Sequence, residues 1–418
     1  MYKKTVLKNG LRILTCPMMN TRSVTVLILV RAGTKYEKKE ENGISHFLEH
    51  MCFRGTRKRP HPLDISQEID GVGGMFNAFT SKDWTGYFVK VDFSQLKLAL
   101  DVVSDILLHS IFKEEEIEKE RGVIIEEIKM IEDTPTHYIE DLWEELLYKN
   151  QPAGWNIAGT KETVSNIKRE NLINYVNNFY RAKNTVVGIA GRVIPKDVIY
   201  LVRDYFSDIK EGGERKKIKV QEFQKEPEKL FFKKDTQQTH LALGVRAFNI
   251  FDKRKYALSL LATILGGNMS SRLFQELREK RSLAYYVSTH FETNPETGYL
   301  TTYIGIDHKK INDVTELILK EYEKIEKQVP AQREVNQSKE YLKGRSRLSL
   351  EESENIASFY TMQELLEERI LTLEEKIKAI EKVTPLEITE VAQEIFKKEK
   401  LNLAVISPKK EEIKKLTI

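Results

Sequence analysis

An internal repeat restricts the fold of this 418-residue chain more than any other feature of its sequence. Residues 167–191 read as a helix followed by an apolar strand, and residues 383–407 repeat that order. At a constant offset of 216, apolar positions coincide: Ile167 with Val383, Leu172 with Ile388, Val176 with Ala392 and Tyr180 with Phe396. Gln67-Glu68-Ile69 likewise matches Gln275-Glu276-Leu277. A period of about 200 residues indicates a duplicated domain.

The order of predicted elements within each copy indicates the fold class. Each copy reads as two strands, two helices, two strands, long helices and a final strand, which predicts an α+β fold with a mostly antiparallel sheet packed with helices. A charged stretch with two adjacent glycines, residues 209–229, is the best linker candidate. We therefore expect an N-terminal domain at 1–212, a linker at 213–228 and a homologous C-terminal domain at 229–418.

A short stretch of the first copy, GISHFLEHMCFRGT at 43–56, predicts an amphipathic helix. Its apolar face contains Ile44, Phe47, Leu48 and Met51. His46, Glu49 and His50 lie on the opposite face. Two imidazoles at positions i and i+4 can reach one Zn²⁺ at about 2.0–2.1 Å. The alternative is that both histidines are simply exposed, but the glutamate beside them favours a hydrolytic site, which needs a base.

The duplication separates this chemistry from the demands of the fold. The corresponding helix of the second copy, at 256–267, has Leu260, Thr263 and Ile264 near the places of the two histidines and the glutamate. The second domain is therefore expected to bind no metal. Since the fold can form without a histidine face, the histidines of the first copy are more simply explained by function.

An acidic helix that follows offers a third ligand. The residues three and four positions from Glu127 are all apolar: Val123, Ile124, Met130 and Ile131. Glu126 has a glycine and a lysine among its equivalent neighbours, so we expect it to face water. An ionised glutamate among apolar side chains needs a cation, which zinc or, alternatively, a buried arginine would supply. Glu120, two turns earlier, is expected to hold a ligand imidazole or the water.

The bulk composition excludes several classes of function. The net charge is +4, from 67 basic and 63 acidic residues, which gives no reason to expect nucleic acid or a membrane surface as partner. No stretch is apolar enough for a transmembrane helix, and the beginning of the sequence has no apolar signal region. Cys16 and Cys52 have neither metal-site spacing nor a disulfide framework, and we expect Cys52 to be buried filler. A reducing, cytoplasmic location is therefore expected.

Several motifs together resemble one enzyme family. His46 to His50 form the inverted H-x-x-E-H motif, and ERGVIIEE follows at 120–127. Further similar stretches are NGLRILT near the start, GGMFNAFTS (73–81), EDTP (132–135) and SSRLFQELREKRSLAY (270–285). With these, the chain resembles the pitrilysin family of inverzincin zinc peptidases over almost its whole length. It is most similar to the short bacterial members that are like a processing-peptidase subunit.

The resemblance implies a complete site with one Zn²⁺ per chain. His46, His50 and Glu127 would bind the metal and leave a fourth position open, and Glu49 would be the general base. The resemblance also implies that the first strand of the hairpin at 74–91 lies at a sheet edge, where the substrate adds as another strand. The alternative is an inner hairpin.

Further residues and a partner are assigned by the resemblance alone. Asn77 and Ala78 match family positions that meet the substrate near the scissile bond. Arg278 and Tyr285 match a distant pair, in which tyrosine donates to the oxyanion and arginine holds a substrate carbonyl. Family enzymes close four domains around a chamber, so a two-domain chain implies a homodimer or a heterodimer with a related chain.

The sequence thus predicts a zinc-dependent endopeptidase that hydrolyses peptides or unstructured segments. One alternative is a non-catalytic subunit of the same fold, although such subunits typically lack part of the metal motif. Another is a metal-dependent module that sequesters peptides without turnover. Zinc content and cleavage of an unstructured peptide distinguish the three.

Overall fold

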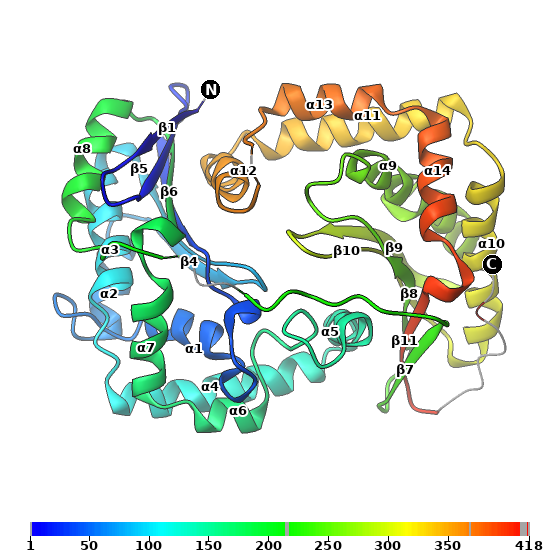
Figure 1. The fold of residues 1–418 in the computed structure, drawn as a ribbon, viewed down its shortest axis with the longest axis horizontal. Helices are drawn as coiled ribbons and strands as arrows, with labels where there is room; N and C mark the ends of the chain where they lie inside the picture. The colour runs from blue at the N-terminus through cyan, green and yellow to red at the C-terminus, as the bar shows by residue number, and fades with distance from the viewer. Residues whose placement is uncertain (1, 214–216, 368, 410–415, 417–418) are drawn as a thin grey trace. The chain divides into compact units, whose positions relative to one another are not determined.

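The computed structural model describes residues 2–213, 217–367, 369–409 and 416. It divides into two compact units, each with its own sheet and core (Figure 1). Unit 1 comprises Met1–Lys129, Trp155–Ile218 and Leu348–Thr372; unit 2 comprises Met130–Gly154, Lys219–Arg347 and Leu373–Ile418. Residues 214–216 of the expected linker lie outside the described residues.

The sheet of unit 1 has six strands in the order β1-β2-β6-β3-β5-β4. Their bounds are β1 Lys3–Val6, β2 Arg12–Pro17, β3 Ser23–Val30, β4 Met75–Thr80, β5 Thr85–Asp92 and β6 Thr185–Gly191. Neighbouring strands are antiparallel except β2 and β6, which are parallel. The central strands β3 and β6 are almost entirely buried, because helices cover both faces of the sheet.

Helices cover both faces of the unit 1 sheet, several on one face and α12 (Ser353–Leu366) on the other (Figure 1). The bounds on one side are α1 Ile44–Met51, α2 Pro62–Asp70, α3 Leu96–Leu108, α4 Glu114–Glu132, α6 Lys161–Asn166, α7 Arg169–Phe179 and α8 Pro195–Tyr205. On the other face, α12 packs on β3 and β6. α12 lies very close to β6 where Thr361 meets Gly188. A Cβ at Gly188 would lie 1.9 Å from the Thr361 hydroxyl oxygen, so this position requires glycine.

Unit 2 has five strands in the order β7-β11-β8-β10-β9. Their bounds are β7 Glu228–Lys233, β8 Thr239–Arg246, β9 Ala284–Thr293, β10 Gly298–Ile306 and β11 Leu401–Ser407. Among these described strands, β7 and β11 pair in parallel and the other pairs are antiparallel. The helices are α5 Pro135–Tyr148, α9 Lys255–Gly266, α10 Ile311–Lys327, α11 Gln332–Ser349, α13 Leu373–Lys382 and α14 Pro385–Ile395. α5 packs on one face of the sheet, and α9, α10 and α14 pack on the other.

The two sheets have the same topology, which confirms the predicted duplication and the mostly antiparallel α+β fold. Apart from β1, each strand of unit 1 has a counterpart: β2 with β7, β6 with β11, β3 with β8, β5 with β10 and β4 with β9. The units are nevertheless not the contiguous halves 1–212 and 229–418 expected from the sequence. α5 lies in the first half of the chain but packs in unit 2, and α12 lies in the second half but packs in unit 1.

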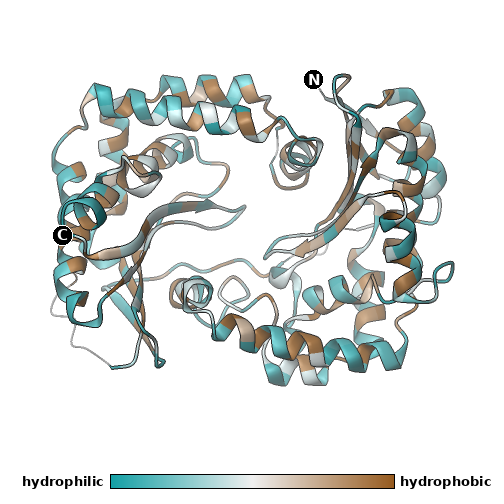
Figure 2. Cartoon of the chain, turned by 180° about the vertical axis from the view of Figure 1, so that it is seen from behind, coloured by the Kyte–Doolittle hydropathy of each residue, from teal (hydrophilic) through white to brown (hydrophobic). Residues whose placement is uncertain are grey.

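The hydropathy of the helices fits their positions on the faces of sheets. Hydrophilic and hydrophobic residues alternate along them, as Figure 2 shows. In the described part of the chain, every helix falls short of the length or the apolar content needed to cross a bilayer.

Candidate metal centre

The histidine helix is α1, and its predicted apolar face is buried. It packs into the core of unit 1 through Ile44, Phe47, Leu48 and Met51, each at most 1% exposed. On its other face, His46 is 9% exposed, and Glu49 and His50 are partly exposed. The amphipathic pattern therefore fixes which side of the helix is available for chemistry.

A buried carboxylate anchors the first turn of α1. Glu37, only 4% exposed, accepts hydrogen bonds of 2.9 Å from the backbone N–H groups of Ser45 and Gly43. Burial raises the pKa of Glu37, and the hydrogen bonds it accepts oppose that rise. Gly43 has φ +96°, and a Cβ there would lie 2.6 Å from the carbonyl oxygen of Ala158, so this turn requires glycine.

Three side chains from α1 and α4 converge at one point. Glu127 Oε2 lies 3.7 Å from His46 Nε2 and 3.5 Å from His50 Nε2. One ligand atom from each residue lies within 4.8 Å of the others. Two ligand atoms at about 2.1 Å from a tetrahedral metal are about 3.4 Å apart. The three side chains thus fit a single Zn²⁺ with little adjustment.

The protonation of the two imidazoles suits metal binding. Burial, and secondarily the charge of His50, lower the pKa of His46 to about 3, so its ring is neutral near pH 7. His46 Nδ1 is buried and has no hydrogen-bond partner within the described residues. For His50, burial lowers the pKa, but the hydrogen bond with Glu120 and the nearby carboxylates outweigh it and raise the pKa. Neutral imidazole is the form that binds metal, so metal must compete with a proton at His50.

An outer pair of charged groups orients His50. Glu120 Oε2 accepts a hydrogen bond of 2.9 Å from His50 Nδ1, and Glu120 Oε1 lies 2.5 Å from Arg54. Glu120 is 1% exposed, so the ion pair with Arg54 compensates for its burial. With Nδ1–H directed at Glu120, the lone pair of Nε2 faces Glu127 and the metal position.

Glu49 lies beside this group on the same face of α1. Its Oε2 accepts a hydrogen bond of 2.6 Å from the Thr80 hydroxyl at the end of β4. Burial raises the pKa of Glu49, against the effect of the Thr80 hydrogen bond. A carboxylate with a raised pKa close to a metal site suits proton transfer.

The expected surroundings of Glu127 were partly wrong. Val123 and Met130, two of the four apolar residues around Glu127 on the helix, are 47% and 60% exposed. The Glu127 side chain is itself 31% exposed, and the buried acid of this helix is Glu120. Glu127 is distinguished by the direction it shares with Glu120 along α4, toward the histidines. Glu126 is 72% exposed and pairs with Lys129, so it faces solvent as predicted.

The residues expected to meet substrate lie on an edge strand. Asn77 and Ala78 belong to β4, which ends the strand order of its sheet and pairs with β5. The hairpin is thus at an edge, not in the interior of the sheet. The Ala78 N–H donates to Asn77 Oδ1 at 2.8 Å, so it is directed away from β5.

Arg278 and Tyr285 belong to unit 2, and both are exposed. Arg278 lies in a short π-helix, Phe274–Glu279, with its guanidinium 5.0 Å from the ring centroid of Phe274. Tyr285 lies on β9, the edge strand that corresponds to β4, and is 60% exposed. Their role remains a prediction from the family resemblance.

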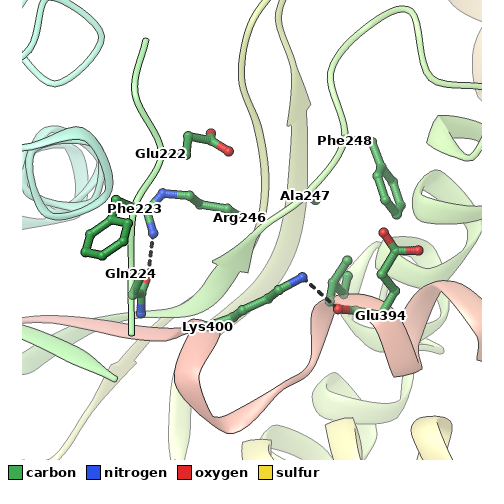
Figure 3. Close-up of a pocket in the computed structure, with 9 residues that line it drawn as sticks. Glu222, Phe223, Gln224, Arg246, Ala247, Phe248, Glu394 and Lys400 are labelled. Carbon is green, nitrogen blue, oxygen red and sulfur yellow. Dashed lines mark hydrogen bonds between the residues drawn. The ribbon is translucent and has the colours of Figure 1, made fainter. Parts of the chain in front are cut away.

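A separate cavity of about 270 Å³ lies in unit 2 (Figure 3). It is lined by Glu222, Phe223, Gln224, Arg246, Ala247, Phe248, Glu394, Ile395 and Lys400. The two cations that line it are occupied by protein oxygens: Arg246 donates to Gln224 and to the carbonyl of Leu147, and Lys400 donates to the carbonyl of Glu394. None of the residues predicted for the hydrolytic site lines this cavity.

Sequence reasoning missed three residues of the centre: Glu37, Arg54 and Thr80. Arg54 lies four positions after His50, a spacing that could have indicated a shared partner. Thr80 lies within the GGMFNAFTS stretch but has no local signal of contact with α1. Glu37 precedes the helix by seven residues, too far for a standard N-cap.

Comparisons with known proteins show the family of the chain. Residues 12–161 match the family described as Insulinase (Peptidase family M16), and residues 166–342 match Peptidase M16 inactive domain. An uncharacterized zinc protease of Bacillus subtilis, YmxG, is 36% identical over 98% of both chains. The chain belongs to peptidase family M16. A Streptomyces coelicolor member, also named an uncharacterized zinc protease, is 33% identical over 98% of this chain and 90% of its own.

Solved structures share the M16 fold. A protease from Helicobacter pylori superposes with a TM-score of 0.92 at 24% identity, covering 98% of this chain and 99% of its own. A Pseudomonas fluorescens protein, named peptidase M16 inactive domain, gives 0.89 at 17% identity, covering 98% of each chain. At these identities the likeness supports the fold alone.

Proposed function

We propose that this M16 protein is a zinc-dependent endopeptidase that hydrolyses peptides or unstructured segments. The convergence of His46, His50 and Glu127, with Glu49 beside them, is the observation that carries the proposal. These three side chains would hold one Zn²⁺. Bound there, zinc would supply a Lewis acid that polarises a scissile carbonyl and makes water more acidic.

The residues of the chain divide the remaining work. Glu49 accepts the proton of the attacking water and later delivers it to the leaving amine. Glu120 keeps the His50 ring in one orientation. The free edge of β4, with Asn77 and Ala78, binds the substrate as an added strand. Arg278 would contact a substrate carbonyl, and Tyr285 would contact the oxyanion. A second copy or a related chain would supply these two residues to the site.

The test compares the wild-type chain with Glu49→Gln. Wild type should bind one zinc per chain and cleave a quenched, unstructured peptide. Glu49→Gln should bind the same amount of zinc, because all three ligands remain, but cleave at least about 100-fold more slowly for lack of a base. Loss of zinc together with activity would mean that Glu49 is a ligand and would contradict the assigned role.

The alternative is a non-catalytic or peptide-sequestering subunit. It is favoured by the name of the second matching family, Peptidase M16 inactive domain, which the similar Pseudomonas fluorescens protein also carries. That family match covers residues 166–342, outside the metal centre. A zinc-loaded wild type that binds the peptide but leaves it intact would establish this alternative.

We also propose a cytoplasmic location for the protein. Its two cysteines are free and buried, which fits a reducing compartment.

A further inference from the structure

Thr80 connects the edge strand β4 to the candidate base. Its hydroxyl donates to Glu49 Oε2 at 2.6 Å, a short hydrogen bond to a carboxylate. Within the described residues, Thr80 is the one hydrogen-bond donor to this carboxylate, and Oε1 has no hydrogen bond. Thr80 therefore determines which oxygen of Glu49 is occupied and which is open.

The pairing of β4 places the Thr80 backbone at the free edge of the sheet. The Ala78 N–H donates to the Asn77 side chain and not to β5. In an antiparallel ladder, backbone groups alternate between the partner strand and the opposite edge. Thr80 is two residues from Ala78, so its backbone also points to the free edge. Consistently, the next residue, Ser81, donates its N–H to Trp84 across the hairpin.

The side chains of the same residues face α1. Phe76 and Ala78 pack against the core that contains α1, whereas Phe79 packs against the cluster on the opposite face. Because side chains alternate along a strand, Thr80 shares the α1 face with Phe76 and Ala78. A strand added along β4 would thus meet the backbone of Thr80, whose side chain holds Glu49.

On the basis of the proposed function, we propose that Thr80 is a positioning residue that orients the Glu49 carboxylate for the substrate strand on β4. Among the described residues, no second hydrogen bond restrains the side-chain torsions of Glu49. A base that is misplaced by about 1 Å can lose about 100-fold in rate. The hydroxyl of Thr80 restrains the Glu49 carboxylate, and Thr80 belongs to β4, the strand on which the substrate is proposed to bind.

The experiment uses full-length, zinc-loaded protein and the quenched peptide. Thr80→Val keeps the shape of the side chain and removes the donor, whereas Thr80→Ser keeps the donor. We expect Thr80→Val to lower kcat by about 10- to 100-fold with KM and zinc content unchanged, and Thr80→Ser to stay within about threefold of wild type. Thr5→Val, on the opposite edge strand β1, is the matched control and should leave kcat unchanged.

A second measurement does not depend on activity. In a crystal structure of metal-free Thr80→Val, the Glu49 side chain should leave the position it has beside β4. If Thr80→Val does not fold, Thr80→Ala removes the donor without adding bulk and should show the same loss of kcat.

The outcomes separate this inference from the proposed function. A wild type that does not cleave would contradict the proposed function itself. A cleaving wild type with unchanged kcat in Thr80→Val, an unmoved Glu49, or a loss confined to KM would each overturn the role of Thr80. A loss of kcat that Thr80→Ser does not restore would mean that the hydroxyl is not responsible.

Discussion

Three acidic side chains of α4 have different surroundings, although they lie within residues 120–127. Glu120 is buried between His50 and Arg54, Glu127 faces both imidazoles, and Glu126 pairs with Lys129 in solvent. All three side chains are glutamates. At the residue scale, the direction in which each side chain leaves the helix and the charges near it decide what its carboxylate can do.

This difference leads to a prediction about zinc. Glu127→Gln should weaken zinc binding by more than about 100-fold, a larger effect than loss of an outer-shell partner, because it replaces a charged ligand. Glu126→Gln, one residue away, should bind zinc as wild type does. Competition with a chromogenic chelator measures both affinities. Equal affinities in the two variants would show that Glu127 does not bind the metal.

The sequence could identify the three converging residues but not all the reasons for their arrangement. Spacing on α1 predicted His46 and His50 because a helix has a fixed period. The apolar neighbours of Glu127 predict a buried carboxylate, yet two of them, Val123 and Met130, are exposed. Helical neighbours show which face a residue occupies; whether another element covers that face depends on tertiary packing. Thr80 and Glu37 contact α1 from other elements, so one helix could not reveal them.

At the element scale, a buried ion pair ties the β4–β5 turn to the segment before α1. Lys35 Nζ lies 2.8 Å from Asp83 Oδ2, and Lys217 Nζ lies 2.6 Å from Asp83 Oδ1. The Lys35 N–H also donates to the Lys82 carbonyl at 2.9 Å. The turn that follows Thr80 is thereby held against the chain that leads into the metal helix.

The ion pair predicts a pH-dependent effect on stability. Burial raises the pKa of Asp83, but the charges of Lys35 and Lys217 outweigh it and hold the pKa below its usual 3.8. A lowered folded-state pKa stabilises the fold above pH 3.8, and this contribution is lost as the pH falls through the folded-state pKa. Asp83→Asn should lower the free energy of unfolding by about 3–5 kcal/mol at pH 7.

Urea unfolding checks this prediction across pH. The difference in the free energy of unfolding between wild type and Asp83→Asn should narrow as the pH falls below 3.8, where Asp83 of the unfolded chain is protonated before Asp83 of the folded chain. Asp208→Asn removes an exposed carboxylate paired with His109 and should change stability by less than about 0.5 kcal/mol. A constant difference at all pH values would contradict a role for the Asp83 charge.

The exchanged helices show where sequence reasoning reaches its limit for elements. α5 and α12 each pack in the unit that is formed mainly by the other half of the chain. Trp143 on α5 and Tyr360 on α12 are both buried against a sheet. An apolar helix face indicates that it is covered, but not by which of two similar sheets.

At the scale of the whole molecule, the predicted site residues are divided between the units. His46, His50 and Glu127 belong to unit 1, and Tyr285 belongs to unit 2. The Tyr285 side chain is 60% exposed and makes no hydrogen bond within the described residues, so its hydroxyl is available to another molecule. The family resemblance implies a chamber of four such domains, and this chain forms two units. We therefore propose a homodimer whose sites are completed in trans.

Mixing two inactive variants tests the homodimer. Glu49→Gln lacks the base, and Tyr285→Phe lacks an oxyanion donor worth about 10²–10³ in rate. If Tyr285 acts across the dimer, a mixed dimer combines the intact metal centre of one chain with the intact tyrosine of the other. Random exchange makes about half the dimers mixed, and each mixed dimer has one working site. Activity should therefore return to about a quarter of wild type if the sites are independent and the oxyanion donor has this effect on the rate.

Differently tagged chains report subunit exchange separately. Complete exchange without recovery at any mixing ratio would rule out sites shared between copies, and a monomer on sizing would rule out the dimer.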